Sequence, residues 1–208
     1  MQIDTDAIVC GVRSHGEHGA VVRMLTPKHG LVAAYVRGGR GRRMRPVLIP
    51  GNVVSAQLRS RTESQLPQAT IELAHSRAPI FSEPLPAGGI EWATALVAAA
   101  LPERQPYPRL YEAMAGLLDA IEAAPSASGW GVALARFELL LLSELGYGRE
   151  TSTLPHWLAA GRVRDWSEVL GVLEMSGLDL FREILSGRTQ SLQDSRARLV
   201  DRLRRATT

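Results

Sequence analysis

Short apolar segments separated by turn signals dominate the first 82 residues, and they constrain the fold of this region more than any other feature. Turn signals stand at 14–19, at 27–30 and at Pro50-Gly51. Glycine and proline at such spacing divide a chain into short strands. Five strands with this punctuation predict a small barrel, and such barrels with basic loops are a common platform for single-stranded nucleic acid. The expected strands cover residues 3–12, 20–26, 31–37, 52–59 and 69–74.

From residue 83 onward the pattern becomes helical. Residues 84–89 are rich in proline and glycine and indicate a linker. Alanine-rich residues 90–101 and the apolar stripe of 109–124 predict helices. Residues 130–145 are apolar nearly all round, as expected of a helix buried at the centre of a bundle.

These patterns predict an α+β protein with two domains, a barrel in residues 1–82 and an all-helical domain in residues 83–208. Charge follows the same division. Residues 1–82 hold 11 basic and 5 acidic side chains, whereas residues 83–208 hold 13 and 16. A basic barrel joined to a slightly acidic helical part suggests that the two parts meet different partners.

The most basic segment is a loop at residues 37–45, in which five arginines and three glycines stand without an acid. Arginine suits phosphate because its planar fork donates two parallel hydrogen bonds and keeps its charge at any working pH. The competing explanation is a solvated loop in an arginine-rich chain, because the sequence has 23 Arg and one Lys. We expect the loop to contact a nucleic-acid backbone through Arg37, Arg40, Arg42, Arg43 and Arg45.

Five further basic residues stand at or near the ends of expected strands, where a barrel could bring them onto one face with the loop. Dispersed, solvated charges explain them equally well. Aromatic residues for base stacking are scarce here, since only Tyr35 and Phe81 are available and Tyr35 also suits a core position. We therefore expect binding that is mostly electrostatic and weakly sequence-specific. The five residues are Arg13, Arg23, Lys28, Arg59 and Arg61.

No segment of the sequence has the pattern of a catalytic or metal site. Cys10 is the only cysteine and lies in an apolar run, as a buried structural thiol does. The segment 15–18, His-Gly-Glu-His, has the wrong spacing for two ligands on one helix face and suits a surface turn. The glycines of 38–41 lack the Gly-Lys-Ser/Thr ending of a phosphate-binding P-loop. We expect a protein without enzymatic activity or cofactor.

Two features bear on location. The N-terminus carries Asp4 and Asp6 rather than the basic and then apolar layout of a signal peptide. No apolar stretch approaches the roughly 18 residues that span a bilayer. A cytoplasmic, nucleoid-associated protein is the expectation.

The last expected helix, 192–205, carries five arginines around a leucine stripe. A second phosphate contact is one reading of this helix. Docking by the leucines, with the arginines in water, is the favoured one. The arginines are Arg196, Arg198, Arg202, Arg204 and Arg205.

Three segments together resemble the RecO family of bacterial recombination mediators. The first comprises Ala7-Ile8-Val9, His15-Gly16-Glu17, Leu25-Thr26 and Gly30, which are similar to the opening strands of that family. The second is Val36-Arg37-Gly38-Gly39-Arg40, similar to its basic glycine-containing loop. The third combines Tyr107-Pro108-Arg109-Leu110-Tyr111 with Arg136-Phe137-Glu138-Leu139 and Leu145-Gly146-Tyr147-Gly148.

The resemblance implies an N-terminal OB-fold barrel, a helical C-terminal domain and a role without covalent catalysis. It implies binding of single- and double-stranded DNA, annealing of complementary strands and cooperation with RecR in loading RecA onto coated single strands. It also implies binding of the acidic, hydrophobic tail of single-stranded DNA-binding protein (SSB). By resemblance, the five loop arginines fall in the DNA-contact region and Arg136 falls in the tail-binding pocket. A surface ion pair is the competing role for Arg136.

One departure concerns metal. Many members of the family follow Gly-Tyr-Gly with a cysteine cluster that holds a structural zinc, whereas residues 149–164 here contain no cysteine and one histidine, His156. We expect no zinc module and a region packed by Trp157 and Trp166 instead. Two functional alternatives remain beside the recombination mediator: a protein-interaction adaptor whose barrel is only a scaffold, and a general RNA-binding OB protein without annealing activity.

Overall fold

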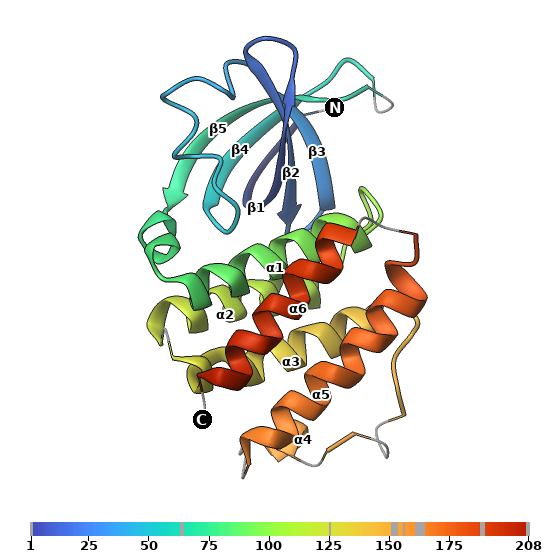
Figure 1. Cartoon of the computed structure of the whole chain (residues 1–208). Coiled ribbons are helices and arrows are strands. Elements are labelled where there is room, and N and C mark those ends of the chain that lie inside the picture. Colours follow the sequence, from blue (N-terminus) through green and yellow to red (C-terminus); the bar gives the residue numbers. More distant parts are fainter. Residues whose placement is uncertain are drawn as a thin grey trace. The chain divides into compact units, whose positions relative to one another are not determined.

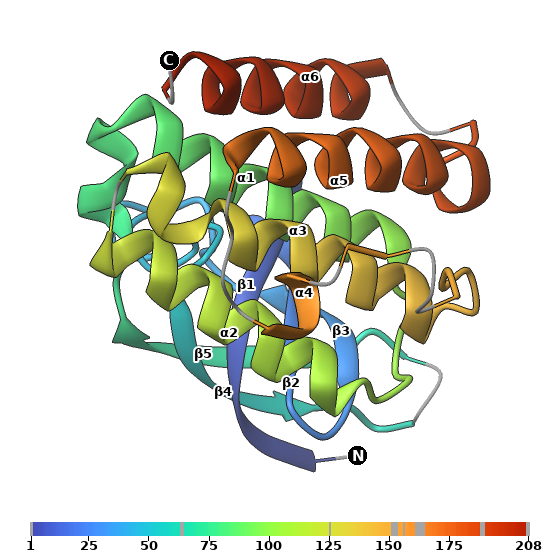
Figure 2. The same ribbon diagram turned by 90° about the horizontal axis from the view of Figure 1, so that it is seen from below.

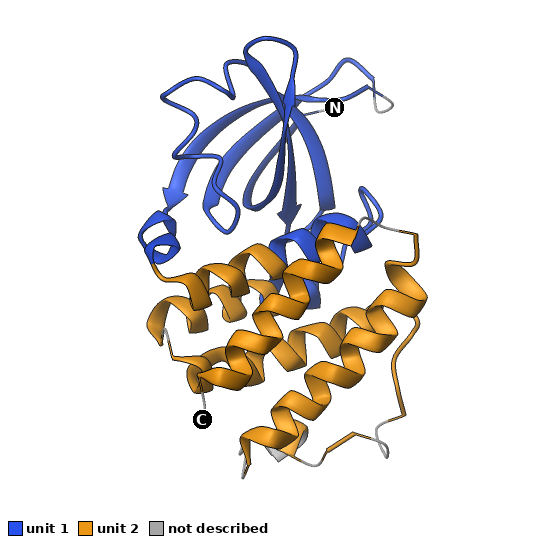
Figure 3. Cartoon of the chain, in the orientation of Figure 1, with its two compact units in different colours: residues 1–82, 93–112 blue, residues 83–92, 113–208 orange. Residues whose placement is uncertain are grey.

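The computed structural model describes residues 2–62, 65–124, 126–150, 154–155, 157–160, 165–187 and 190–206. The chain forms two compact units (Figure 3). The first unit joins Met1–Ser82 to Ala93–Glu112, and the second joins Glu83–Trp92 to Ala113–Thr208. Among the described residues, no helix combines the length and the apolar character needed to cross a membrane.

The first unit contains a closed five-stranded barrel with strand order β1-β2-β3-β5-β4 (Figure 1). All neighbouring strands are antiparallel except β3 and β5, which pair in parallel through Tyr35–Gln68 and Val36–Ala69. This topology confirms the expected OB-fold barrel. The strands are β1 (Gln2–His15), β2 (Gly19–Thr26), β3 (Gly30–Val36), β4 (Val53–Arg59) and β5 (Gln68–His75).

Strand β1 is the longest strand, and it pairs with its two neighbours one after the other along its length. Residues 2–8 pair with β4, and residues 8–15 pair with β2. The pairing register shifts between Val9 and Gly11, where a β-bulge bends the strand. The intervening Cys10 is buried, and its thiol donates to the carbonyl of Ile8 at 3.4 Å. Strand β1 is thus one long bent strand whose first half pairs with β4 and whose second half pairs with β2.

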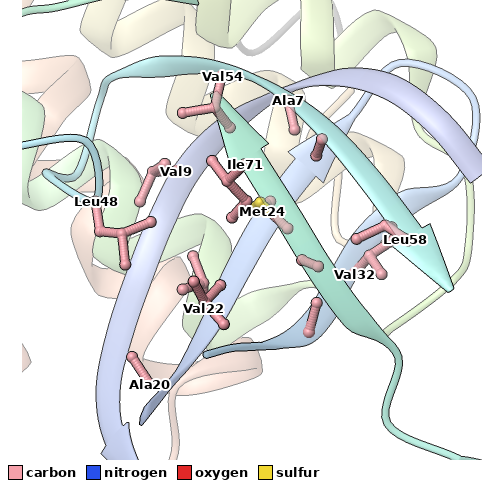
Figure 4. Close-up of a cluster of buried hydrophobic side chains, with 14 residues drawn as sticks. Ala7, Val9, Ala20, Val22, Met24, Val32, Leu48, Val54, Leu58 and Ile71 are labelled. Atoms are coloured by element: carbon pink, nitrogen blue, oxygen red, sulfur yellow. The ribbon is translucent and has the colours of Figure 1, made fainter. Parts of the chain in front are cut away.

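Alternate residues of the strands fill the barrel interior. Figure 4 shows Val22, Met24 and Ile71 pointing into this core. The period-two alternation expected of half-buried strands is clear in β4, where Val54, Ala56 and Leu58 are buried between exposed neighbours. Leu48, from the loop between β3 and β4, completes the cluster, and Met44 and Val47 pack against it from the same loop.

The helical elements begin with η1 (Ala78–Ser82). Residues 84–89 were expected to be a linker, and that expectation is wrong: they are the first turns of α1. Proline is tolerated in a first helical turn, since its missing N–H has no intrahelical partner there. A Cβ at Gly89 would come within 3.0 Å of the Trp130 ring, so glycine permits close packing. The helices are α1 (Pro84–Ala100), α2 (Pro108–Ala123), α3 (Ala127–Glu144), α4 (Trp157–Ala160), α5 (Trp166–Asp179), the π-helical η3 (Leu180–Ile184) and α6 (Gln190–Arg205).

In the second unit, α3 supplies several of the largest buried side chains. Trp130, Leu134, Phe137 and Leu141 are at most 1% exposed. Figures 1 and 2 show α5 and α6 running side by side in this unit. The nearly all-round apolar sequence of α3 accounts for its burial.

A buried carboxylate connects four helices of this unit, α1, α3, α5 and α6. Glu138 of α3 is 1% exposed and Arg196 of α6 is 7% exposed. The Arg196 Nε donates to Glu138 Oε1 at 3.1 Å, and its terminal nitrogen donates to Oε2 at 2.7 Å. Trp92 Nε1 and Ser176 Oγ donate to the same carboxylate at 2.7 and 2.5 Å. The expectation that all C-terminal arginines stand in water is therefore wrong for Arg196.

The burial of Cys10 yields a first prediction. Desolvation raises the pKa of this thiol to about 12, so the nucleophilic thiolate is scarce at neutral pH. We expect the folded protein to resist a disulfide-exchange reagent such as Ellman's reagent at pH 8. In guanidinium chloride one thiol per chain should react at once. Rapid reaction of the native protein would contradict the closed, bulged structure of β1.

The buried carboxylate yields a second prediction. Glu138→Ala leaves the Arg196 charge buried and uncompensated, which should lower the free energy of unfolding by about 3–5 kcal/mol. Glu112→Ala, at an exposed position of α2, should change it by less than about 0.5 kcal/mol. Urea denaturation followed by circular dichroism measures both.

A double variant tests the same pair further. Glu138→Leu combined with Arg196→Met removes both charges, so it should be less destabilised than either single variant. Additive losses would mean that the two side chains contribute independently.

Candidate nucleic-acid interface

Three loops gather beside the end of β3. They are the β1–β2 turn (residues 16–18), the arginine loop (residues 37–45) and the described residues of the β4–β5 loop (60–62 and 65–67). The backbone N–H of Arg40 donates to the carbonyl of His18 at 3.2 Å, and that of Tyr35 donates to the carbonyl of Pro67 at 2.8 Å. These bonds bring the arginine loop against the β1–β2 turn and the β4–β5 loop against β3.

The arginine loop is a folded structure rather than a loose basic segment. Its backbone forms successive turns, with bonds from Gly41 to Gly38 (2.8 Å) and from Met44 to Gly41 (3.0 Å). Met44 packs against the barrel core, and the Asn52 side-chain amide holds the carbonyls of Pro46 and Val47 just beyond the loop. The loop backbone is thereby fixed while all five of its arginines remain exposed.

Two of these arginines bind backbone carbonyls and so stabilise the loop itself. A terminal nitrogen of Arg40 donates to the carbonyl of Glu17 at 3.1 Å, and the Arg45 Nε donates to the carbonyl of Arg40 at 3.0 Å. Among the described residues, the guanidinium groups of Arg37, Arg42 and Arg43 have no hydrogen-bond or ion-pair partner. Three solvated cations therefore stand on a fixed loop and can exchange water for an anion.

A shallow groove of about 750 Å³ lies between the β1–β2 turn, the end of β3 and the β4–β5 loop. A second hollow of about 430 Å³ lies between the arginine loop and β5. Arg37, Gly38 and Gln68 line both, so the two hollows adjoin. In OB-folds, the β2–β3 face and the loops after β1 and β4 are the usual oligonucleotide surface. The principal lining side chains of the larger groove are His15, Tyr35, Arg37, Leu66 and Gln68.

Comparison with known proteins gives a family match for the barrel part and for the helical part of the chain. Residues 1–77 match the family model described as "Recombination protein O N terminal", and residues 87–153 match "Recombination protein O C terminal". This chain belongs to the RecO family. The two family models together match most of the chain, and their boundaries agree with the division into barrel and helical elements.

Relatives named DNA repair protein RecO align with this RecO-family chain to different extents. The one from Phenylobacterium zucineum is 42% identical over 153 residues, which are 73% of this chain and 62% of the relative. The one from Rhodospirillum centenum is 32% identical and covers 100% of this chain and 97% of the relative. The one from Xanthobacter autotrophicus is 33% identical, covering 99% and 98%. The alignment with the Phenylobacterium relative therefore spans less than two thirds of that relative's length.

Of the other basic residues proposed for DNA contact, Arg13 and Arg59 lie next to residues that line the groove of this RecO-family barrel. Arg13 is exposed near the end of β1, Arg59 is the last residue of β4, and Arg61 is exposed in the β4–β5 loop. Lys28 is exposed in the β2–β3 turn, at the other end of β2. Arg23 lies midway along β2, where it pairs with Glu103 at 3.3 Å and donates to the carbonyl of Ala98. Arg13 thus stands two residues from His15 and Arg59 pairs with Gln68, both of which line the groove, whereas none of these five basic residues is among the described residues that line it.

Arg136 lies on the exposed side of α3 in the helical unit. Its terminal nitrogen donates to the carbonyl of Leu158 in α4 at 2.8 Å. Its chain neighbours Phe137 and Glu138 are both 1% exposed, so the Arg-Phe-Glu segment divides between surface and core. Tail binding by Arg136 remains a prediction.

In its described portion, the segment that follows Gly-Tyr-Gly contributes one ion pair and the buried Trp157 ring, and Trp166 of α5 packs beyond it. Arg149 Nε lies 2.6 Å from Asp179 Oδ2, and this hydrogen-bonded carboxylate raises the pKa of the Arg149 guanidinium. The Trp157 side chain is buried, and a Cβ at Gly131 would come within 2.3 Å of the Trp166 ring. Among the described residues no group of three His, Cys, Asp or Glu side chains could hold a metal ion, and His156 lies outside them.

The difference between the loop arginines that bind backbone carbonyls and those that do not yields a third prediction. Arg40→Ala removes the side-chain bonds to the β1–β2 turn and should destabilise the protein by about 0.5–1.5 kcal/mol. Arg42→Ala loses no such bond, and its effect should stay within about 0.5 kcal/mol. Urea denaturation distinguishes the two. Equal stability of the two variants would mean that Arg40 does not anchor the loop.

Proposed function

We propose that this protein is a non-enzymatic DNA-repair protein that binds single- and double-stranded DNA through its barrel and anneals complementary strands. The observation that carries this proposal is the set of three solvated arginines, Arg37, Arg42 and Arg43, on a fixed loop beside an OB-fold groove. The name shared by its relatives, DNA repair protein RecO, supports the role in repair.

Annealing follows from the charge of such a surface. Two complementary strands repel each other through their phosphates, and a protein that neutralises phosphates releases counterions and lowers that repulsion. Arginines held on a loop contact phosphates without reading the bases, so the protein would accept any sequence. A groove next to the arginines leaves space for one strand while its partner pairs.

The proposal extends to the partners of a recombination mediator. We assign to this protein cooperation with RecR, binding of the C-terminal tail of SSB, and assistance in loading RecA on SSB-coated strands at the nucleoid. Family membership supports these roles. Arg136 could take a tail carboxylate because its bond to Leu158 uses one of five guanidinium N–H donors.

Strand annealing tests the proposal. Wild type should accelerate pairing of two labelled complementary oligonucleotides, both bare and coated with SSB. The variant Arg37→Glu/Arg42→Glu/Arg43→Glu should lose this acceleration while its circular dichroism spectrum stays that of wild type. It spares Arg40 and Arg45, which the loop needs for its own structure.

A matched control carries the same change of charge elsewhere. Arg198→Glu/Arg204→Glu/Arg205→Glu alters three exposed positions of α6, where Arg204 and Arg205 form exposed ion pairs with Glu174 and Asp201. It should retain annealing, and its circular dichroism spectrum should stay that of wild type. Equal loss in both triple variants would indicate a general charge effect rather than a site on the barrel. No acceleration by folded wild type would favour the adaptor or the RNA-binding alternative.

The salt dependence of binding gives a fourth prediction. Log affinity for single-stranded DNA should fall linearly with log salt concentration, with a slope of about 0.7 per phosphate neutralised. Arg42→Gln removes one cation, so the slope should decrease by about 0.7, equally for oligonucleotides of different sequence. Fluorescence anisotropy at several salt concentrations measures the slope. An unchanged slope would exclude a phosphate contact at Arg42.

A further inference from the structure

Five residues form a row across the outer surface of the barrel, each opposite the next in the sheet. The pairing runs from Arg13 to Val21, from Val21 to Tyr35, from Tyr35 to Gln68 and from Gln68 to Arg59. Paired residues lie on the same side of a sheet, and none of these five is buried. The row therefore places one aromatic ring at its centre and one arginine at each end.

Tyr35 belongs to the outer surface of the barrel and not to its core. The flanking residues Ala34 and Val36 fill the interior, so alternation turns Tyr35 outward. Its ring lies over the backbone of Gly19, where a Cβ would come within 2.3 Å of the ring carbon Cε2. The absence of a side chain at position 19 makes room for the ring.

The immediate surroundings of this ring suit a flat ligand. His15 meets it edge-on, with centroids 5.8 Å apart and an interplanar angle of 76°. Tyr35 and His15 both line the 750 Å³ groove, together with Leu66, which is 47% exposed. Arg37, one of the solvated arginines, lines the same groove. An aromatic face, an apolar neighbour and one arginine thus share one hollow.

We propose that Tyr35 is a stacking platform for an unpaired nucleobase, with Arg13, Arg37 and Arg59 holding the phosphates on either side. This inference rests on the proposed DNA binding and names the ligand of the groove as a single strand with accessible bases. Duplex DNA would be held by the arginine loop alone, because its bases are stacked on one another and their faces are closed to Tyr35. The groove would therefore give the protein a preference for single strands, and the loop would give it affinity for both forms.

The row explains why stacking needs no sequence preference. Every base has a π-face, so a ring flanked by cations accepts any unpaired nucleotide. The part of the groove that the structure describes places only one aromatic ring other than histidine, and one platform suits one base. We expect the contribution of this base to be a factor of about five or more in affinity.

A cycle of protein and ligand variants isolates the stacking contact. Fluorescence anisotropy at one salt concentration would compare an oligothymidylate with an oligomer of the same length whose sugars carry no base. Wild type should bind the thymidylate about fivefold or more tightly. Tyr35→Leu should bind the two equally, and Tyr35→Phe, which keeps the ring, should restore the difference.

Two further variants separate the ring from the phosphate contacts. Gly19→Ala displaces the ring without changing it, so it should also abolish the difference between the two oligomers. Arg37→Ala should weaken the binding of both oligomers by the same factor, since both retain phosphates. Resistance of Cys10 to Ellman's reagent reports whether each variant keeps the closed barrel.

The outcomes separate the two proposals. If wild type binds both oligomers equally, or if Tyr35→Leu keeps the wild-type difference, stacking on Tyr35 is wrong while DNA binding by the loop stands. If wild type binds neither oligomer, the proposed DNA binding itself is wrong. The stacking platform is supported if Tyr35→Leu abolishes the difference in affinity between the two oligomers and Tyr35→Phe keeps it.

Discussion

The parallel pairing of β3 with β5 is the contact on which the proposed binding face depends. It extends over only two residue pairs, Tyr35–Gln68 and Val36–Ala69, yet it turns a five-stranded sheet into a closed barrel. Parallel pairs cannot be made by a hairpin, so the chain must pass through β4 and the β4–β5 loop before it returns beside β3. That return places Pro67, whose carbonyl accepts the N–H of Tyr35, next to the ring-bearing residue. Closure of the barrel and assembly of the groove are therefore one event.

Electrostatics determine which arginines of the loop can bind a ligand. Five like charges within nine residues repel one another, and the fold offsets part of this by giving two guanidinium groups backbone carbonyls to bind. The carbonyls of Glu17 and Arg40 satisfy Arg40 and Arg45, and in return the loop is tied to the β1–β2 turn. The other three arginines keep their charges in water, where the Coulomb cost of like charges is small. An incoming phosphate would relieve repulsion at those three positions.

The sequence predicted the strands well because their signals are local. Turn residues and alternating apolar residues found all five strands to within a few positions, and the basic loop stood out by composition. Two other features depend on contacts between distant residues. From the sequence, Tyr35 suits a core position, but the strand register places its neighbours Ala34 and Val36 inside the barrel and Tyr35 outside. Arg196 looks like the exposed arginines near it, but in the fold it binds Glu138 of α3. A linker was expected at 84–89 because proline and glycine suggest one, whereas Trp130 makes close packing at Gly89 favourable. No pattern within a single segment contains such information.

The Arg-Phe-Glu segment of α3 shows how one short motif can serve two purposes. Successive residues of a helix are about 100° apart around its axis, so three neighbours cannot share one face. Here Phe137 and Glu138 belong to the interior, where Glu138 binds Arg196, Trp92 and Ser176, while Arg136 reaches the surface beside α4. The buried pair fixes the rotation of α3 about its axis, because a carboxylate with four donors tolerates little displacement. The direction in which Arg136 points is thus set by its buried neighbours. A protein ligand that binds Arg136 would depend on the Glu138–Arg196 pair without touching it.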